Sequence, residues 1–192
     1  MNSESEKVSM NITKKIAINA ILLAICIASQ FFKNLSVYIT GPIINLCIVL
    51  SVMMTGIGWG IILSVITPVT AFFIAGSPVT QAVPLIVPFI MAGNAVLAVM
   101  VHFFFKPAVI KEEIFISFRS AIFAILSALA KGVFMGLTIS LWLIPTFIPE
   151  ASPLRGKMSV FQMTFSVTQF TTALIGFVYF YIVWKAVSKV AK

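Results

Sequence analysis

Five polar side chains interrupt long apolar stretches of this sequence, and one of them is charged. They are Lys131, Asn94, Asn45, Gln162 and Gln169. The five acidic residues all lie outside these stretches, so the Lys131 ammonium has no carboxylate partner at the same depth. Burying an ammonium group in a membrane costs at least about 2.5–3.5 kcal/mol, and charges kept there usually serve function. An unpaired lysine favours a ligand with a carboxylate, a phosphate or a polarised carbonyl.

The residues around Lys131 predict which way its side chain faces. At spacings of three and four residues, one helix face collects Ser120, Ala124, Ser127, Lys131, Met135, Thr138 and Trp142. One interpretation is a lysine that points into a cavity and awaits a ligand. The other is a lysine whose hydrogen bonds to backbone carbonyls or glutamines only hold helices together.

The four amides, taken as a group with Lys131, also favour a binding site. For any single amide, an interhelical hydrogen bond worth about 0.6 kcal/mol is the simpler interpretation. As a group with Lys131, however, they occupy the middle and one half of the membrane depth. We expect a binding site there, with Lys131 as the charged contact and Asn94 and Gln169 as amide contacts. Asn45, Gln162 and Trp142 are weaker candidates at its rim.

The elements that carry these side chains are predicted to be membrane-spanning helices. The 192 residues are 60% hydrophobic and 9% charged, with a mean hydropathy of +1.12, whereas a soluble domain is about half apolar and a quarter charged. A polar tail over 1–13 precedes one six-helix domain over 14–189. The predicted spans are 14–32, 41–56, 59–75, 83–105, 115–144 and 160–184.

Proline and glycine residues predict details of these spans and of their connections. Pro42 suits the first turn of the second helix, and Thr67-Pro68 predicts a bend in the third. The short link Gly56–Gly58 makes the second and third spans an antiparallel hairpin. The Pro and Gly content of the connections 76–81 and 145–159 argues against helix there and suits either a lid or a plain surface loop.

The distribution of Lys and Arg predicts the orientation of the bundle. Nine lie at the two termini and the even-numbered connections, namely Lys7, Lys14, Lys15, Lys106, Lys111, Arg119, Lys185, Lys189 and Lys192. Three lie in the alternate connections, namely Lys33, Arg155 and Lys157. The positive-inside rule then places both termini in the cytoplasm and the polar half of the bundle outside. The net charge of +8 is an orientation signal with contacts to anionic lipid, since no basic patch suits nucleic acid.

Several chemistries lack their residues in this sequence. It has no phosphate-binding GxxxxGK[ST] motif, no acid or histidine pair at membrane depth and no set of metal ligands. Cys26 and Cys47 form no CxxC pair and are expected to be free core residues. We therefore expect neither an enzyme nor a resident cofactor or metal. A carrier without ion-coupling acids would take its energy from another subunit.

Short motifs over most of the chain resemble those of a known transporter family. They are the stripe Ala17, Ala20, Ala24 and Ala28, then Gly41–Asn45 (GPIIN), Thr67-Pro68, Pro88–Asn94 (PFIMAGN), Ala130-Lys131 and Gln169–Gly176 (QFTTALIG). In this order and spacing, the sequence resembles the substrate-binding S components of energy-coupling factor (ECF) transporters, six-helix proteins of bacterial vitamin uptake. The resemblance implies a bacterial cell membrane, a coupling membrane subunit docked on the alanine stripe, and two ATPase subunits. It also implies a captured vitamin or related metabolite and no enzymatic activity.

Other interpretations stay open at this point. The alanine stripe also suits ordinary helix packing within one chain. A self-sufficient small transporter or channel would need no ATPase partner. A membrane-embedded enzyme or assembly factor would need an acid or histidine at an interface, for which Glu112, Glu113 and His102 are the only candidates.

Overall fold

The chain is an all-helical bundle throughout the residues that the computed structural model describes, which are 10–32, 36–111 and 117–191. Six helices in these ranges are long and apolar enough to cross a membrane, as a multi-pass membrane protein requires. The first three are single helices: α1 (Ile12–Gln30), α2 (Val37–Thr55) and α3 (Ile57–Ala75). The start of α1 falls within the predicted tail 1–13, whose residues 1–9 lie outside the described ranges.

The other three spans are composite. In the fourth, α5 (Ile86–Met100) passes through a π-helical segment (Val101–Phe105) into α6 (Lys106–Lys111). In the fifth, α7 (Phe118–Met135) passes through a π-helical segment (Gly136–Leu143) into α8 (Ile144–Phe147). In the sixth, a 3₁₀ turn (Pro153–Lys157) leads into α9 (Met158–Thr164), and α10 (Val167–Ala191) follows a break at residues 165–166.

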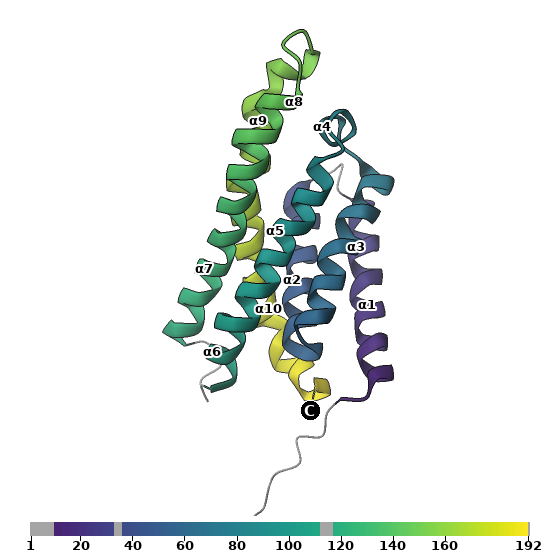
Figure 1. Cartoon of the computed structure of the whole chain (residues 1–192). Coiled ribbons are helices and arrows are strands. Elements are labelled where there is room, and N and C mark those ends of the chain that lie inside the picture. Colours follow the sequence, from purple (N-terminus) through teal and green to yellow (C-terminus); the bar gives the residue numbers. More distant parts are fainter. Residues whose placement is uncertain (1–9, 33–35, 112–116, 192) are drawn as a thin grey trace, which may run out of the picture.

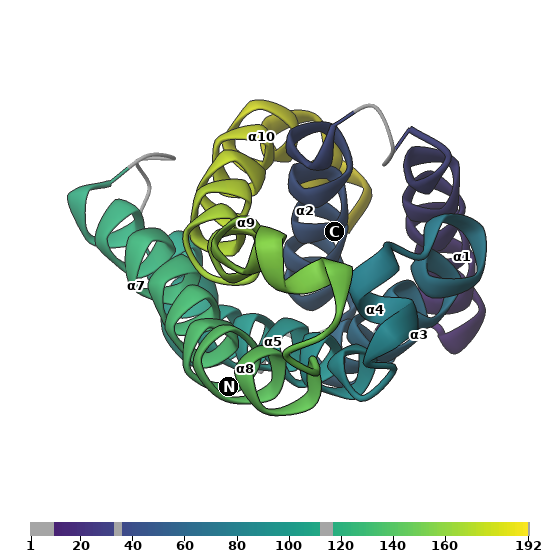
Figure 2. The ribbon, with the colours of Figure 1, turned by 90° about the horizontal axis from the view of Figure 1, so that it is seen from above.

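The helices run along a common direction, and α2 lies at the centre of the bundle (Figures 1 and 2). It packs against α1, α3 and α10, and 56% of the residues in its apolar window are buried. The start of α1 and the end of α10 lie at one end of the bundle, which we call the terminal end. The short helices α4 (Pro78–Ala82), α8 and α9 lie at the other, which we call the loop end.

The hairpin predicted between the second and third spans is confirmed. Gly56 both ends α2 and begins α3, with a φ of 104° that strongly favours glycine. Its N–H donates to the carbonyls of Ser51 and Val52 at 3.2 Å each. The ammonium of Lys106 also donates to the Val52 carbonyl, at 3.0 Å, so the end of α2 is well satisfied.

The prediction for the start of α2 was wrong by more than one turn. The helix begins at Val37, because the Ser36 side chain accepts a hydrogen bond from the N–H of Tyr38 at 3.1 Å and caps it. Pro42 therefore lies inside the helix, and Asn45 lies deeper than the first turn. In α3, Pro68 lies inside the helix, which continues to Ala75.

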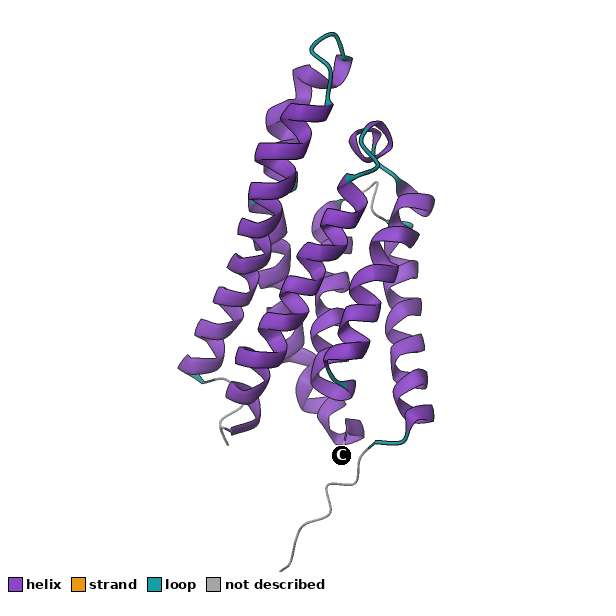
Figure 3. Cartoon of the chain, in the orientation of Figure 1, coloured by secondary structure: helices purple, strands orange, loops and turns teal. Residues whose placement is uncertain are grey.

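The connections predicted to lack helix contain short helices instead. In both, a Ser-Pro pair supplies a capping side chain and a first helical residue that needs no N–H partner. Ser77 accepts from the N–H of Thr80 at 3.4 Å, and Pro78 begins α4. Ser152 accepts from the N–H of Leu154 at 3.3 Å, and Pro153 begins the 3₁₀ turn. Proline here starts short helices, which the general rule against proline missed. Figure 3 shows them at the loop end, joined by short loops.

The apolar interior forms two separate clusters of buried side chains. The terminal-end cluster includes Leu97 of α5, Ala128 of α7 and Ala173 of α10. The loop-end cluster includes Ile86 and Met135, together with Phe165 from the break between α9 and α10. In each of the fourth, fifth and sixth spans, a short stretch of residues therefore lies between the residues of one cluster and those of the other. These stretches contain Asn94, Lys131 and Gln169.

Candidate ligand-binding site

Lys131 is held by two asparagines that come from two other helices. Its Nζ atom donates to Oδ1 of Asn45 on α2 at 2.6 Å and to Oδ1 of Asn94 on α5 at 2.7 Å. The exposed fractions of the three side chains are 2% for Lys131, 2% for Asn45 and 3% for Asn94. Both acceptors are neutral, and Glu150, the single acid in the described ranges, is exposed. The positive charge is therefore hydrogen-bonded without being neutralised.

Glycines let the helices that carry this cluster approach one another closely. A Cβ atom on Gly176 of α10 would lie 2.8 Å from Cβ of Asn45, and one on Gly41 of α2 would lie 2.9 Å from Thr172. On α7, a Cβ atom on Gly132 would lie 2.8 Å from Cβ of Phe170. Helix packing at these points requires glycine, and it brings α2 and α7 against α10 beside the lysine.

A hydrogen-bond chain orients Asn45 toward the lysine. Nδ2 of Asn45 lies 3.5 Å from Oγ1 of Thr172, which in turn donates to the carbonyl of Gln169 at 3.2 Å. An ammonium group can only donate, so it must meet the oxygen side of each amide. The contact of Nδ2 with Thr172 leaves Oδ1 of Asn45 on the side of Lys131. Four helices, α2, α5, α7 and α10, therefore contribute to one polar network.

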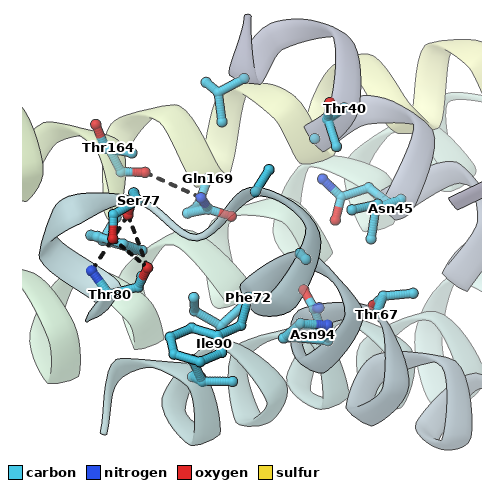
Figure 4. A pocket seen from close by; sticks show the side chains of 18 of the residues that line it. Thr40, Asn45, Thr67, Phe72, Ser77, Thr80, Ile90, Asn94, Thr164 and Gln169 are labelled. Atoms are coloured by element: carbon cyan, nitrogen blue, oxygen red, sulfur yellow. Dashed lines mark hydrogen bonds between the residues drawn. The ribbon is translucent and has the colours of Figure 1, made fainter. Parts of the chain in front are cut away.

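Lys131 and both asparagines line a cavity of about 390 Å³ in the loop-end half of the bundle. Its volume lies within the usual range for small-molecule sites. Figure 4 shows Asn45 and Asn94 on one side of it and Phe72 and Ile90 along its wall. The other lining residues are Val37, Thr40, Gly41, Ile44, Thr67, Pro68, Ala71, Ala75, Ser77, Thr80, Val87, Thr164, Phe165 and Gln169. The cavity is thus mostly apolar, with a charged pole at Lys131.

Gln169 lies on this cavity because the last span is broken beside it. The helix α9 ends at Thr164, which leaves carbonyl groups at its end without helical partners. Nε2 of Gln169 donates to the Thr164 carbonyl at 3.2 Å. In Figure 4 the amide nitrogen of Gln169 faces Thr164, and its oxygen points the other way. The break therefore fixes the orientation of this side chain.

Three polar groups of the site have no protein partner within the described ranges. They are the third N–H of Lys131, the Nδ2 group of Asn94 and Oε1 of Gln169. Two of these are donors that lie next to each other, since Asn94 contacts the lysine through the same amide. The site therefore offers an acceptor-bearing ligand two adjacent donors, and one acceptor elsewhere on its surface.

Of the six predicted site residues, the structure brings Lys131, Asn94, Asn45 and Gln169 to one cavity, whereas Trp142 and Gln162 do not line it. Trp142 is 51% exposed and packs edge-on against Phe89, with ring centroids 5.8 Å apart. The predicted stripe assumed a regular α-helix, but the segment Gly136–Leu143 is π-helical, and a π turn shifts the phase. Beyond Met135 the buried residues of this segment are Ile139, Ser140 and Leu143, and the expected Thr138 and Trp142 are not among them.

Gln162 is displaced by the break in the last span. Its predicted alignment with Gln169 needs one continuous helix, whereas residues 165–166 separate α9 from α10. Gln162 instead pairs with Ser140 of the π-helical segment. Nε2 of Gln162 donates to the Ser140 carbonyl at 3.0 Å, and Oγ of Ser140 donates to the Gln162 carbonyl at 2.7 Å. These two hydrogen bonds connect α9 to the fifth span.

Other lining residues were not singled out from the sequence as contacts of the site. Thr40 precedes the Gly41-Pro42 pair, and Thr67 precedes Pro68. A threonine next to a glycine or proline within a span was thus the sequence feature that could have indicated these two contacts. No sequence feature could have indicated Phe72 and Ile90, because an apolar side chain that faces a cavity cannot be told from one that faces lipid or the core by residue type.

The alanine stripe of α1 faces outward along its whole length. Ala17, Ala20, Ala24 and Ala28 are all exposed, and Ile21 and Ile25 lie beside them with exposed fractions of 62% and 45%. The opposite face of α1 is buried through other residues, namely Asn19, Leu22, Cys26, Ser29 and Gln30. Helix packing within this chain therefore does not account for the stripe.

Groups that suit other chemistry lie apart from the cavity. Within the described ranges, no three His, Cys, Asp or Glu side chains come together as metal ligands would. Cys26 and Cys47 are free and buried. His102 is in the π-helical segment of the fourth span, and Glu112 and Glu113 lie outside the described residues.

No protein-family model, no curated protein and no solved structure matches the chain.

Proposed function

We propose that this protein is the substrate-binding S subunit of an ECF-type importer, which captures a vitamin or related small metabolite outside the cell. One observation carries the proposal. The buried Lys131 ammonium lines a cavity of ligand size. In the described ranges, two neutral amides are the only hydrogen-bond partners of this ammonium. A lysine that served packing alone would leave this charge uncompensated beside the cavity, at a cost of a few kcal/mol. A ligand supplies what the site lacks.

The position of the cavity supports capture from outside. It lies in the loop-end half, away from the described ends of the chain. With nine basic residues on the side of the termini against three on the other, the positive-inside rule favours termini in the cytoplasm. The cavity then lies in the outer half of the membrane, and residues of α4 and α9 contribute to its lining.

The exposed face of α1 supports a membrane partner. Its window is the least buried of the six spans, at 22%. Small residues at intervals of three and four allow another helix to approach closely inside a bilayer, where lipid tails supply no hydrophobic drive for association. A coupling subunit docked on Ala17, Ala20, Ala24 and Ala28 would link this chain to two ATPase subunits. The chain itself then binds and delivers substrate and catalyses no reaction.

The test is retention of a small molecule by the purified protein. We expect native mass spectrometry of the protein released from mild detergent to show a bound small molecule in the wild type. The Lys131→Met variant should lose it. Lys106→Met is the matched control, because Lys106 is a partly buried lysine that donates to the Val52 carbonyl at the terminal end of the bundle. Equal retention by both variants would refute the proposed site.

A second measurement tests the partner. Co-purification of the tagged chain should recover a coupling membrane protein together with ATPase subunits. Uptake that persists after those ATPases are deleted would instead establish a self-sufficient transporter.

A further inference from the structure

The cavity lining combines one lysine with neutral side chains in the part of the chain that the structure describes. Within the described ranges, Lys131 is the single charged side chain on its surface, and the remaining polar lining consists of amides and hydroxyls. Asn45 and Asn94 solvate the ammonium through their oxygens but carry no charge. A ligand that fills the cavity must therefore supply the rest of the solvation of Lys131.

The charge of the ligand then decides whether binding is favourable. A neutral ligand would exclude water from the ammonium and would offer it only a dipole as a hydrogen-bond partner. A doubly charged phosphate would bring a second negative charge into a low-dielectric site that has no second cation. A cation would meet direct repulsion. A ligand with a single negative charge leaves the cavity neutral, and its hydrogen bond to the ammonium is charge-assisted.

We propose that the substrate of this site is a small monocarboxylic acid with a largely apolar body, an inference that rests on the proposed substrate-binding function. One carboxylate oxygen accepts from the third N–H of Lys131. The other accepts from the Nδ2 group of Asn94, which lies next to it and has no partner among the described residues. Two oxygens on one carbon match two adjacent donors, as in other bidentate carboxylate contacts.

The rest of the cavity lining indicates the chemistry of the rest of the ligand. Phe72, Ile90, Val87 and Phe165 form apolar walls that favour a hydrocarbon or ring portion. Oε1 of Gln169 has no partner among the described residues and lies on the same surface, so a hydroxyl or N–H on the ligand body can donate to it. A volume of about 390 Å³ holds a compact metabolite and excludes a long acyl chain.

The experiment offers the purified protein a pooled library of small monocarboxylic acids. The same pools contain the primary amide, the phosphate monoester and the amine that share each carbon skeleton. Native mass spectrometry identifies the masses retained, and each hit is titrated. We expect retained compounds to be monocarboxylates, bound about tenfold or more tightly than their matched amides, with phosphates and amines not retained.

An isosteric variant tests whether charge balance is the cause. Asn94→Asp places a carboxylate where the structure has an amide oxygen 2.7 Å from Nζ of Lys131, so the cavity becomes neutral without a ligand. We expect this variant to lose the preference for the acid over its amide. Gln162→Glu makes the same amide-to-acid change outside the cavity lining and should keep the preference. Circular dichroism and thermal melting confirm that both variants fold.

The outcomes separate this inference from the proposed function. Retention of an amide, a phosphate or an amine in preference to its matched acid would overturn the monocarboxylate assignment while leaving substrate binding intact. An unchanged acid preference in Asn94→Asp would also overturn it. Failure to recover ATPase subunits and persistence of uptake without them would refute the importer subunit but not the ligand class. If no compound of any class is retained, the monocarboxylate assignment is rejected.

Discussion

Nζ of Lys131 on α7 lies 2.6 Å from Oδ1 of Asn45 on α2, a residue 86 positions earlier in the chain. The asparagine orients the ammonium and solvates it, but it leaves the charge in place. A carboxylate at the same position would neutralise the lysine. The pairing with neutral amides instead keeps the charge available to a ligand.

The first prediction concerns the stability cost of Lys131. Lys131→Met removes the cost of burying the ammonium, at least about 2.5–3.5 kcal/mol, but also removes its hydrogen bonds to the oxygens of Asn45 and Asn94, worth roughly 1 kcal/mol each. We therefore expect the free energy of unfolding to rise by about 1 kcal/mol. Ligand retention should be lost at the same time. Thermal melting in detergent measures the first effect, and native mass spectrometry measures the second. A lower melting temperature would mean that the lysine serves the fold.

The second prediction concerns Thr172, which orients Asn45. Thr172→Val removes the hydroxyl that meets Nδ2 of Asn45 at 3.5 Å and keeps the shape of the side chain. Since the contact is long, we expect a loss of stability below about 1 kcal/mol and ligand affinity weakened by about fivefold. Thr171→Val is the control, because its hydroxyl donates only to the Val167 carbonyl on the exposed face of α10. Equal titration curves for the two variants would remove Thr172 from the network.

The third prediction concerns the tight link between α2 and α3. Gly56 has a φ of 104°, a region that a side chain makes costly, so Gly56→Ala should lower the free energy of unfolding by about 1–2 kcal/mol. Gly58, two residues later, lies in α3 with nothing within 4 Å of the Cβ position. Gly58→Ala should therefore be neutral or stabilise the protein by up to about 1 kcal/mol. The reverse order of stabilities in urea or thermal unfolding would contradict the role of Gly56.

The fourth prediction separates partner docking from ligand binding. Ala20→Leu and Ala24→Leu add bulk to the exposed stripe of α1 and should reduce recovery of the coupling and ATPase subunits by about tenfold or more. Ligand retention should not change, because neither residue lines the cavity. Ala82→Leu adds the same bulk at an exposed position of α4 and should leave recovery unchanged. Recovery that is equal in all three variants would exclude α1 as the docking face.

The fifth prediction concerns orientation. Cys26 and Cys47 have exposed fractions of 0% and 1%, so the native chain should react little with a polar maleimide. A cysteine placed by Gly156→Cys at the exposed loop end should react in intact cells. One placed by Lys14→Cys, at the exposed start of α1, should react only after the cells are opened. The reverse pattern would place the cavity on the cytoplasmic side.

The residues by themselves determined the class of this protein and the importance of one position. A span needs only a local run of apolar residues, so the six membrane helices are readable along the chain. An ammonium without an acid at that depth is an equally local feature, and it singles out Lys131 from residue types alone. The alanine stripe was also visible, but its exposure was not, because periodicity shows that residues share a face and not what covers it.

Only the tertiary structure decided which polar residues meet. Asn45, Asn94 and Lys131 come together because glycines let their helices approach, a non-local relationship that no spacing within one helix encodes. Gln162 and Trp142 fell outside the cavity because a break and a π-helical segment shifted the phase that a regular helix would have kept. The bilayer requires each span to be apolar, so the sequence reveals the spans. The few polar side chains choose their partners by helix packing, and that choice exists only in the folded bundle.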